Sequence, residues 1–363
     1  MRKQTIIFTV FNDLVYDQRM MRICGSLSRH YDVLLVGKRT KASKPLEKLA
    51  YRQKRLPAWF KKGKLAYVEY NLRLFCFLLF QRTNAICAID LDTILPCYIV
   101  SGLKKIPRIY DAHELFCEMK EIVERPIIYK CWKWIERNTV PHFKNGYTVN
   151  DILASEFRKL YAVQYKVIRN LPILKDIKPR THKGQYILYQ GAVNEGRSFE
   201  TLIPAMQWVD STLIICGDGN FMSKARDLVK AYQLESKIIF KGSIVPSALW
   251  KYTQDAAIGI TLFDRIGDNN YYSLANRFFD YIQAGIPQLC VDYPVYRQIN
   301  EQYRVALLVE DLSPENLAAS LNNLLHNDVL YHELQENCFK ARTMYQWQNE
   351  EKYLLDFYQQ ILK

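Results

Sequence analysis

The chain has 363 residues, 49% of them hydrophobic, and carries 50 Lys and Arg against 37 Asp and Glu, a net charge of +13. A chain of this length usually forms two domains, and its apolar content excludes a mainly disordered protein. The longest uninterrupted apolar run, 74–80, is much shorter than the roughly 20 residues that cross a bilayer, so we expect no membrane span.

The first residues resemble a secretory signal only weakly, because Asp13 and Asp17 interrupt the apolar stretch and no small-residue cleavage site follows. The nine cysteines contain no C-x-x-C pair and mostly lie in apolar segments, as expected of reduced core residues. Neither the cysteines nor the six histidines form a cluster of zinc ligands. We therefore expect a cytoplasmic protein with no metal ion built into its fold.

The positive charge is concentrated in the first half of the chain. Residues 1–170 contain 31 basic and 15 acidic side chains, a net +16, whereas residues 171–363 contain 19 and 22, a net −3. Any polyanionic partner should therefore bind the first half, although such an asymmetry also serves solubility alone.

Short apolar segments typical of strands alternate with amphipathic segments typical of helices. In the first half we expect strands at 5–10, 32–36, 85–89, 107–110, 146–149 and 165–168, with helices including 17–29 and 118–137. In the second half we expect strands at 186–190, 212–216, 237–240, 257–261, 288–291 and 305–309, again with helices between them. This alternation predicts two α/β domains, each a doubly wound parallel sheet.

The segment 170–183 contains Pro172 and Pro179 without a clear hydrophobic period, which is typical of a linker. The first domain would then span 1–172 and the second 173–345. A last helix, over about 346–363, could pack back on the first domain or on the second.

Ligands of open parallel sheets bind beyond the carboxyl ends of the strands, so residues directly after strands are the candidate site. Gly217 and Gly219 follow the expected strand 212–216, while Gly191 and Arg197 lie between strand 186–190 and a helix. Glycine lets a ligand approach the backbone, and a helix N-terminus with one arginine suits a phosphate. Tight strand-to-helix turns and a solvated or ion-paired arginine would explain the same residues.

The segment 268–287 contains a helix for which Ser273 is the expected N-cap and Gly285 the C-terminal stop. Asn276 and Asp280 are four residues apart and share one face of this helix. A carboxylate on that face suits the vicinal hydroxyls of a ribose, whereas a solvated residue beside Arg277 is the alternative.

Residues 276–287, Asn-Arg-Phe-Phe-Asp-Tyr followed by Ala-Gly-Ile-Pro at the end, resemble the N-K-x-F-E-Y-x-x-x-G-x-P block of retaining nucleotide-sugar glycosyltransferases of family 4. Further blocks resemble this family in the same order along nearly the whole chain, at 13–27, 90–93, 110–116, 189–197, 216–219 and 240–242. The resemblance implies the GT-B fold, in which two Rossmann-like domains face each other across a cleft. The first domain would bind the acceptor and the second the nucleotide sugar.

The resemblance also implies an activity. The protein would move a hexose-type sugar from a nucleoside diphosphate donor to a glycan or glycolipid acceptor, with retention, without a cofactor and without a metal ion. Catalytic roles fall on His113, beside the transferred sugar, and on Arg197, at the donor diphosphate. Asp280 matches the residue that holds the ribose, the backbone of Ser273 and Leu274 the start of the phosphate-binding helix, and Gly242 to Ile244 the loop that contacts the base. The other donor-side residues are Gly191, Gly217, Gly219 and Asn276, and the acceptor-side residues are Asn12, Asp13, Arg19, Asp90, Asp92 and Asp111.

Two positions depart from the family pattern. The family's glutamate eight residues before its second acid is Tyr272 here, and the first of its two phosphate-binding cations falls at Ala192. Asp264, Arg265 or Asp268 could compensate for these changes. The glycine pair that often follows the first strand is replaced by residues 11–13, Phe-Asn-Asp.

Two other functions remain open. A nucleotide-sugar epimerase of the same fold would need additional acid and base carboxylates. A nucleic-acid-binding protein is suggested by the basic first half and the aromatic segment 129–134, but no recognised binding module accompanies them, so we expect no nucleic-acid partner.

The segment 59–80 joins Lys61, Lys62, Lys64 and Arg73 to the apolar run 74–80. A basic cluster beside apolar residues predicts contact with an anionic membrane surface, which would place the enzyme peripherally at the inner face of the membrane. The alternative is that this segment forms a buried helix of the first domain.

Overall fold

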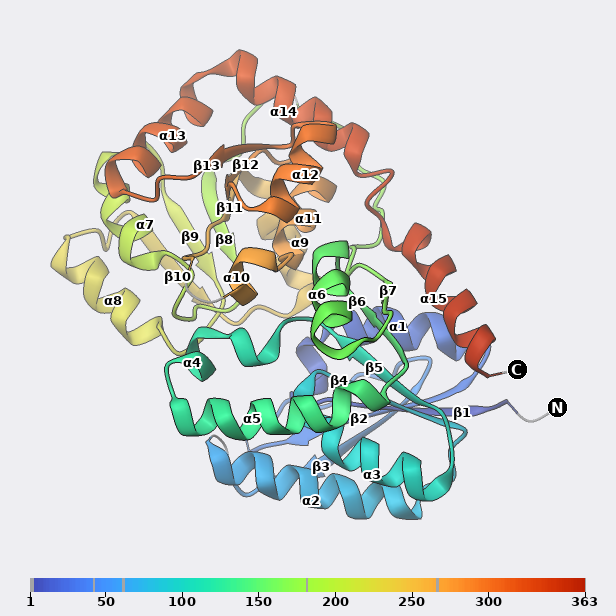
Figure 1. The fold of residues 1–363 in the computed structure, drawn as a ribbon. Coiled ribbons are helices and arrows are strands. Elements are labelled where there is room, and N and C mark those ends of the chain that lie inside the picture. Colours follow the sequence, from blue (N-terminus) through green and yellow to red (C-terminus); the bar gives the residue numbers. More distant parts are fainter. Residues whose placement is uncertain (1–2, 42, 61–62, 181, 266–267, 363) are drawn as a thin grey trace. The chain divides into compact units, whose positions relative to one another are not determined.

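The computed structural model describes residues 3–41, 43–60, 63–180, 182–265 and 268–362 (Figure 1). The chain divides into two compact units, of which unit 1 comprises Met1–Asn170 and Glu350–Lys363 and unit 2 comprises Leu171–Asn349. The sequence placed this boundary two residues later, after 172. Each unit contains one parallel sheet with helices packed against it, the doubly wound α/β architecture that the sequence predicts.

The described part of unit 1 contains seven parallel strands in the order β3-β2-β1-β4-β5-β6-β7. Their bounds are β1 (Thr5–Thr9), β2 (Asp32–Arg39), β3 (Arg52–Pro57), β4 (Ala85–Ile89), β5 (Arg108–Ala112), β6 (Asn145–Thr148) and β7 (Lys166–Val167). The central strands β1 and β4 are largely apolar and almost fully buried, as expected of strands that are covered on both faces. The strand order reverses between β1 and β4, which is where ligands of such sheets bind.

The helices of unit 1 are α1 (Gln18–Ser28), α2 (Lys64–Phe80), α3 (Ile94–Lys104), α4 (Lys120–Val123), α5 (Pro126–Thr139) and α6 (Asp151–Tyr161). Helix α3 packs against both α2 and α5. The last helix, α15 (Trp347–Ile361), contributes its residues from Glu350 onward to unit 1. There Leu354 and Tyr358 are fully buried, and the hydroxyl of Tyr358 lies 3.2 Å from that of Tyr147 on β6.

The described part of unit 2 contains six parallel strands in the order β10-β9-β8-β11-β12-β13. Their bounds are β8 (Tyr186–Gln190), β9 (Leu213–Cys216), β10 (Ile238–Gly242), β11 (Ala256–Thr261), β12 (Gln288–Val291) and β13 (Ala306–Val309). The helices are α7 (Phe199–Ala205), α8 (Met222–Ala231), α9 (Pro246–Asp255), α10 (Asp268–Tyr272), α11 (Asn276–Ala284), α12 (Pro294–Tyr303), α13 (Pro314–His326) and α14 (Asp328–Ala341). The strand order again reverses, here between β8 and β11.

Two sequence predictions in unit 1 were wrong. The edge strand β3 was missed because its sequence, Arg-Gln-Lys-Arg-Leu-Pro, is polar on both faces. The single helix expected at 118–137 is broken into α4 and α5 at Arg125, which has φ −122° and ψ 86°. The residue before a proline disfavours the helical region, and Pro126 follows it.

All nine cysteines are free thiols. Seven of them are buried, as expected, whereas Cys76 on α2 and Cys131 on α5 are exposed, contrary to the prediction of core positions. None of the described helices combines the length and the apolar character that a bilayer span requires.

Candidate active site

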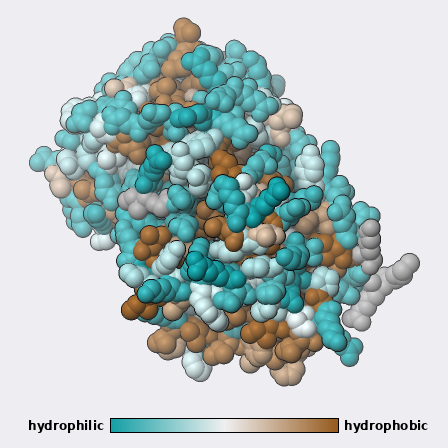
Figure 2. Space-filling model, in the orientation of Figure 1, coloured by the Kyte–Doolittle hydropathy of each residue, from teal (hydrophilic) through white to brown (hydrophobic). Residues whose placement is uncertain are grey.

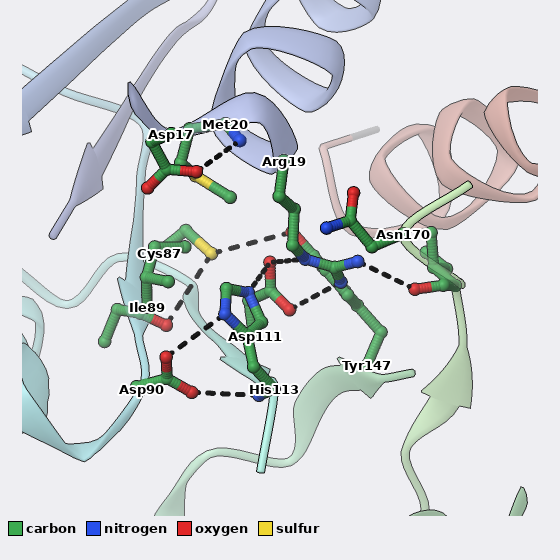
Figure 3. A network of polar contacts seen from close by, with 12 residues as sticks. Asp17, Arg19, Met20, Cys87, Ile89, Asp90, Asp111, His113, Tyr147 and Asn170 are labelled. Carbon is green, nitrogen blue, oxygen red and sulfur yellow. Dashed lines mark hydrogen bonds and ion pairs between the residues drawn. The ribbon is translucent and has the colours of Figure 1, made fainter. Parts of the chain in front are cut away.

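A network of charged side chains lies at the carboxyl edge of the unit 1 sheet (Figure 3). Asp111 is the last residue but one of β5, Asp90 directly follows β4, and Arg19 extends from α1 to meet them. The Nε and Nη2 atoms of Arg19 donate hydrogen bonds of 3.0 and 2.7 Å to the two carboxylate oxygens of Asp111. Its Nη1 atom donates to the carbonyl of Ile168 at 3.1 Å. This bidentate pair is buried, so both charges depend on each other for stability.

His113 follows β5 and lies between two carboxylates. Its Nδ1 atom is 3.1 Å from Oδ2 of Asp90, and its Nε2 atom is 3.1 Å from Oδ2 of Asp111. Burial lowers the pKa of His113, but the charges of Asp111 and Asp90 outweigh burial and raise the pKa to about 10. Burial by itself would raise the pKa of Asp111, but the charges of Arg19 and His113 hold this pKa below its usual range. At neutral pH the ring is therefore an imidazolium, which supplies a fixed positive charge rather than a general base.

The backbone of Asp90 has φ 52°, a left-handed value that a non-glycine residue adopts at a cost of roughly 1–3 kcal/mol. Three hydrogen bonds and ion pairs hold it there. Its N–H donates to the carbonyl of Asp111 at 3.0 Å, its Oδ1 accepts from the backbone N–H of His113 at 2.9 Å, and its Oδ2 faces the ring of His113. This strained conformation aims the carboxylate of Asp90 at His113.

The other acceptor-side residues do not join this network. Asp13 caps a turn by accepting from the N–H of Val15 and forms an ion pair of 3.0 Å with Arg55 of β3. The side-chain amide of Asn12 donates to Asp17 at 3.0 Å. Burial raises the pKa of Asp92 well above its usual range, and the nearby charges of Asp90 and Glu114 add to the shift. The structure thus brings together Arg19, Asp90, Asp111 and His113.

In unit 2, the glycines after β8 and β9 allow two loops to touch. A Cβ atom at Gly217 would lie 1.7 Å from the carbonyl oxygen of Gly191, and one at Gly219 would lie 2.2 Å from that of Val193. Gly191 has φ +127°, a backbone conformation that glycine adopts easily because it has no Cβ atom. Packing between the loops therefore requires these glycines, whether or not a ligand also approaches them.

Arg197 lies on the loop that leads from β8 to α7, at the reversal of strand order. Its Nη1 atom donates to the side-chain oxygen of Asn270 at 3.2 Å, and its guanidinium carbon is 4.5 Å from the ring centroid of Phe263. Phe263 follows β11, so loops from both sides of the reversal meet at this arginine.

Asp280 is half-buried on α11 and contacts the end of β8. Its Oδ2 atom accepts a hydrogen bond of 2.8 Å from Nε2 of Gln190, the last residue of that strand. The Oε1 atom of Gln190 in turn accepts from the hydroxyl of Thr253 at 2.8 Å. This chain of bonds fixes the carboxylate of Asp280 beside the β8 loop.

The prediction that Ser273 caps α11 was wrong. The helix begins at Asn276, and the extended residue before it, Ala275, has no side chain that can cap. The hydroxyl of Ser273 instead donates to the carbonyl of Asn270 in α10 at 3.1 Å. The other end of the helix was predicted correctly, because Gly285 ends it in the left-handed conformation.

The remaining donor-side residues surround these loops. Gly242 ends β10 with φ +67°, Ile244 packs against the cluster that contains Leu188 and Tyr281, and Leu274 packs on the main core of unit 2. Asn276 is exposed at the start of α11. The sequence did not identify Arg277, whose guanidinium lies beside Gly191, as a candidate site residue. Because the family's first phosphate-binding cation falls at Ala192, the sequence could have prompted a search for another cation near this loop.

Within the described residues, no group of three or more His, Cys, Asp or Glu side chains is placed to hold a metal ion. The metal independence of the reaction stays a prediction.

The comparisons with known proteins concern this same architecture. Residues 172–341, almost all of unit 2, match the model of the family described as Glycosyl transferases group 1. The search of curated proteins found no match.

Solved structures resemble the whole chain. The chain is similar to sucrose-phosphate synthase from Thermosynechococcus elongatus, with a TM-score of 0.81 and 15% identity over 99% of each chain. HepE of Anabaena, solved in complex with UDP-glucose, has a TM-score of 0.74 and 11% identity over 98% of this chain and 99% of its own. WaaG, a glycosyltransferase involved in lipopolysaccharide biosynthesis, has a TM-score of 0.73 and 15% identity over 96% of this chain and 98% of its own. These likenesses show that the chain has the predicted GT-B fold.

The family match and the fold together support a glycosyltransferase. They give no support to the epimerase or to the nucleic-acid-binding protein that the sequence left open.

Proposed function

We propose that the protein is a retaining, metal-independent glycosyltransferase similar to family 4, which moves a hexose-type sugar from a nucleoside diphosphate donor to a glycan or glycolipid acceptor. The observation that carries this proposal is the placement of Arg197, Asp280 and the glycine loops at the carboxyl end of β8, the strand beside the reversal of strand order in unit 2. Such a reversal binds ligands in open α/β sheets, and the family match covers this unit.

The donor would lie in unit 2. Asp280, fixed by Gln190, accepts hydrogen bonds from the vicinal hydroxyls of the ribose. Arg197 faces the diphosphate, on which negative charge grows as the glycosidic bond breaks. A nucleoside diphosphate is already a good leaving group, so the enzyme mainly has to position the two substrates and stabilise this charge.

The acceptor would approach unit 1, where the imidazolium of His113 supplies a positive charge beside the transferred sugar. Its imidazolium is held by Asp90 and Asp111 through both ring nitrogens, so it supplies positive charge but does not take a proton from the acceptor. This role agrees with a reaction that uses no side-chain nucleophile.

The experiment that tests the proposal incubates the full chain with UDP-, GDP-, ADP- and dTDP-sugars, with and without glycan and lipid-linked acceptors. UDP-glucose is the first probe because HepE is solved with it. We expect release of the nucleoside diphosphate, with transfer to an acceptor and retention of the anomeric configuration. A new sugar epimer formed without an acceptor would favour the epimerase, and inversion would contradict the retaining mechanism.

We further propose peripheral binding to an anionic membrane, through the outward side of α2. Leu65, Val68, Leu72, Cys76 and Phe80 recur every three or four residues and are all exposed; we call them the outer stripe of α2. The opposite side of the helix, with Tyr70 and Leu74, is fully buried. The segment is thus both the buried helix and the exposed apolar surface that the sequence presented as alternatives.

Neighbouring side chains extend the outer stripe. The side chain of Trp59 is 81% exposed. Two contacts with α2 hold this residue in place: its backbone N–H donates to Glu69 at 2.9 Å, and the guanidinium of Arg73 lies 4.6 Å from its ring centroid. Ile99 and Leu103 of α3 are also exposed, and Figure 2 shows hydrophobic residues gathered along the lower margin, where Figure 1 places α2 and α3.

Exposed basic residues, Lys64, Arg82 and Lys105, accompany the apolar side chains. Lys61 and Lys62, which the sequence also placed in this basic cluster, lie outside the described residues. An apolar face with basic flanks suits the surface of an anionic bilayer, which attracts each cation by about 1 kcal/mol.

A further inference from the structure

Arg277 is a buried cation directed at the loop that follows β8. It is the second residue of α11, and its side chain is only 7% exposed. A Cβ atom at Gly191 would lie 3.2 Å from its Nη1 atom, so the glycine leaves the space that the guanidinium occupies. The guanidinium carbon is 4.7 Å from the ring centroid of Tyr189 and 4.6 Å from that of Phe263.

The charge of Arg277 is not balanced by any described residue. No described carboxylate lies within the 4.0 Å of an ion pair with it, and its Nε atom has no hydrogen-bond partner. Nη1 and Nη2 reach only the hydroxyl of Tyr189 and the carbonyl of Leu262, each at 3.4 Å. A buried charge without an opposite charge beside it is costly, and contacts with aromatic faces offset about 0.5–2 kcal/mol of that cost.

A second buried arginine of unit 2 shows a different arrangement. Arg342 is also buried and also lies over an aromatic ring, that of Phe339. Its Nε atom likewise has no hydrogen-bond partner, but its Nη1 and Nη2 atoms donate to the carbonyls of Ile177 and Lys175, at the start of the unit. Arg342 therefore serves the packing of the chain, whereas Arg277 faces the loop of the candidate donor site.

Arg277 and Arg197 contact the same ring. Their guanidinium carbons lie 4.6 and 4.5 Å from the centroid of Phe263, so both positive charges lie against this ring, and that of Arg277 also lies beside Gly191. Two like charges held together attract an anion with more than one negative charge. A diphosphate has this chemistry.

We propose that Arg277 is a second phosphate-binding residue of the donor site, which contacts the diphosphate together with Arg197 and occupies the role of the cation missing at Ala192. This inference rests on the proposed function, because it requires a nucleoside diphosphate donor. In this role Arg277 contacts only the phosphates of the donor and takes no part in binding the base.

The test measures binding of UDP, GDP, ADP and dTDP, of their matching nucleosides and of inorganic pyrophosphate to the full chain by calorimetry. Arg277→Met should weaken the preferred nucleoside diphosphate and pyrophosphate by about 10- to 100-fold, the usual loss for a charged hydrogen bond. It should leave affinity for the nucleoside unchanged. Arg277→Lys should retain part of the affinity, and adding Ala192→Arg to Arg277→Met should restore it.

Arg342→Met is the matched control, since it removes a buried arginine of the same unit that does not face the loop. It should lower the melting temperature without changing the ratio of diphosphate to nucleoside affinity. Should Arg277→Met fail to fold, Arg277→Lys carries the test, with weaker diphosphate binding and unchanged nucleoside binding as the expected result. Equal diphosphate affinity in the wild type and in the folded Arg277 variants would overturn the inference alone. A wild type that binds no nucleoside diphosphate would overturn the proposed function as well.

Discussion

Asp280 illustrates why a site residue cannot be interpreted from its own chemistry alone. The sequence suggests a carboxylate that binds a ribose and can be removed with little loss of stability. The structure shows that its Oδ2 atom also accepts from Gln190, a side chain that is almost fully buried. Removing the carboxylate would leave Nε2 of Gln190 without its acceptor, at a cost of about 1–3 kcal/mol.

Asp280→Asn is therefore the informative variant, because the amide oxygen can still accept from Gln190. We expect it to keep most of the stability and to weaken donor binding by about 1.5–3 kcal/mol through the loss of a charged hydrogen bond to the ribose. Calorimetric titration of the donor and thermal unfolding measure the two effects separately. Asp280→Ala, by contrast, should lose both binding and stability; equal donor affinity in Asp280→Asn and wild type would show that Asp280 does not hold the ribose.

His113 predicts a pH-dependent contribution to stability. Its folded pKa of about 10 lies above the ordinary value of 6.5, so the ion pairs with Asp90 and Asp111 stabilise the fold fully below pH 6.5. The contribution is lost as pH rises toward 10, because the unfolded chain then holds no proton on this ring. The difference in unfolding free energy between wild type and His113→Gln should fall by on the order of 2–3 kcal/mol between pH 6 and pH 9.

Urea unfolding at both pH values checks this. A difference that stays constant with pH would show that the pKa of His113 is the same in the folded and the unfolded chain. At pH 7, His113→Gln should also reduce sugar transfer while leaving nucleoside diphosphate binding intact. Loss of diphosphate binding in a folded His113→Gln protein would argue against an acceptor-side role.

Strand position predicted the charged network of unit 1, because Asp90, Asp111 and His113 all lie where a strand ends. The ion pair between Arg19 and Asp111 links residues far apart in the chain, and spacing alone could not show it. The position of Arg277 beside the candidate donor site could not be predicted for another reason. Helical periodicity marks its neighbours as core, and only the fold brings its guanidinium to Gly191.

At the scale of elements, buried strands were predicted well because they are apolar on both faces. Edge strand β3 and the break between α4 and α5 were not. Exposure in the first case and a single proline in the second removed the periodic signal. Helix α2 shows the reverse difficulty, since its sequence is apolar on every side and gives no period from which the outward face could be chosen.

The outer stripe of α2 predicts binding to liposomes that contain anionic lipid. Leu72→Glu should reduce co-sedimentation by about tenfold or more, because it replaces an apolar contact worth about 1.5–3 kcal/mol with a charge of the wrong sign. Lys64→Glu should weaken binding less, and mainly at low salt.

Val329→Glu is the control, since Val329 is equally apolar and 82% exposed but lies on α14 of unit 2. Its co-sedimentation should match that of the wild type. Wild-type protein that stays in the supernatant with anionic liposomes at low salt would contradict membrane binding and favour a soluble acceptor.

At the scale of the whole molecule, the sequence predicted two α/β domains but not which of them receives the last helix. Periodicity identifies α15 without indicating the surface that it covers. In the structure, Glu350 accepts from the N–H of Arg169 at 2.8 Å, and Tyr358 packs against Phe8 of β1 with ring centroids 5.9 Å apart. The chain thus returns to complete the core of unit 1.

This arrangement predicts that unit 1 depends on the last residues of the chain. Leu354 is fully buried, so Leu354→Ala should lower the stability of unit 1 by about 2–5 kcal/mol. Hydrogen exchange should show faster opening in β1 and β6, with little change in the strands of unit 2. Tyr353→Ala, at an exposed position of the same helix, should leave exchange in both units unaltered. Uniform destabilisation of unit 2 by Leu354→Ala would contradict this packing.

The central claim is that unit 2 stabilises charge on a departing nucleoside diphosphate, and Arg197 tests it most directly. The measurement is the steady-state release of nucleoside diphosphate from the preferred nucleotide sugar by wild type and by Arg197→Ala, with melting temperatures as the control for folding. We predict a fall in kcat of about 10²- to 10³-fold with a much smaller rise in donor KM, because the charge appears only as the bond breaks. Near-wild-type kcat in a folded Arg197→Ala protein would contradict the account.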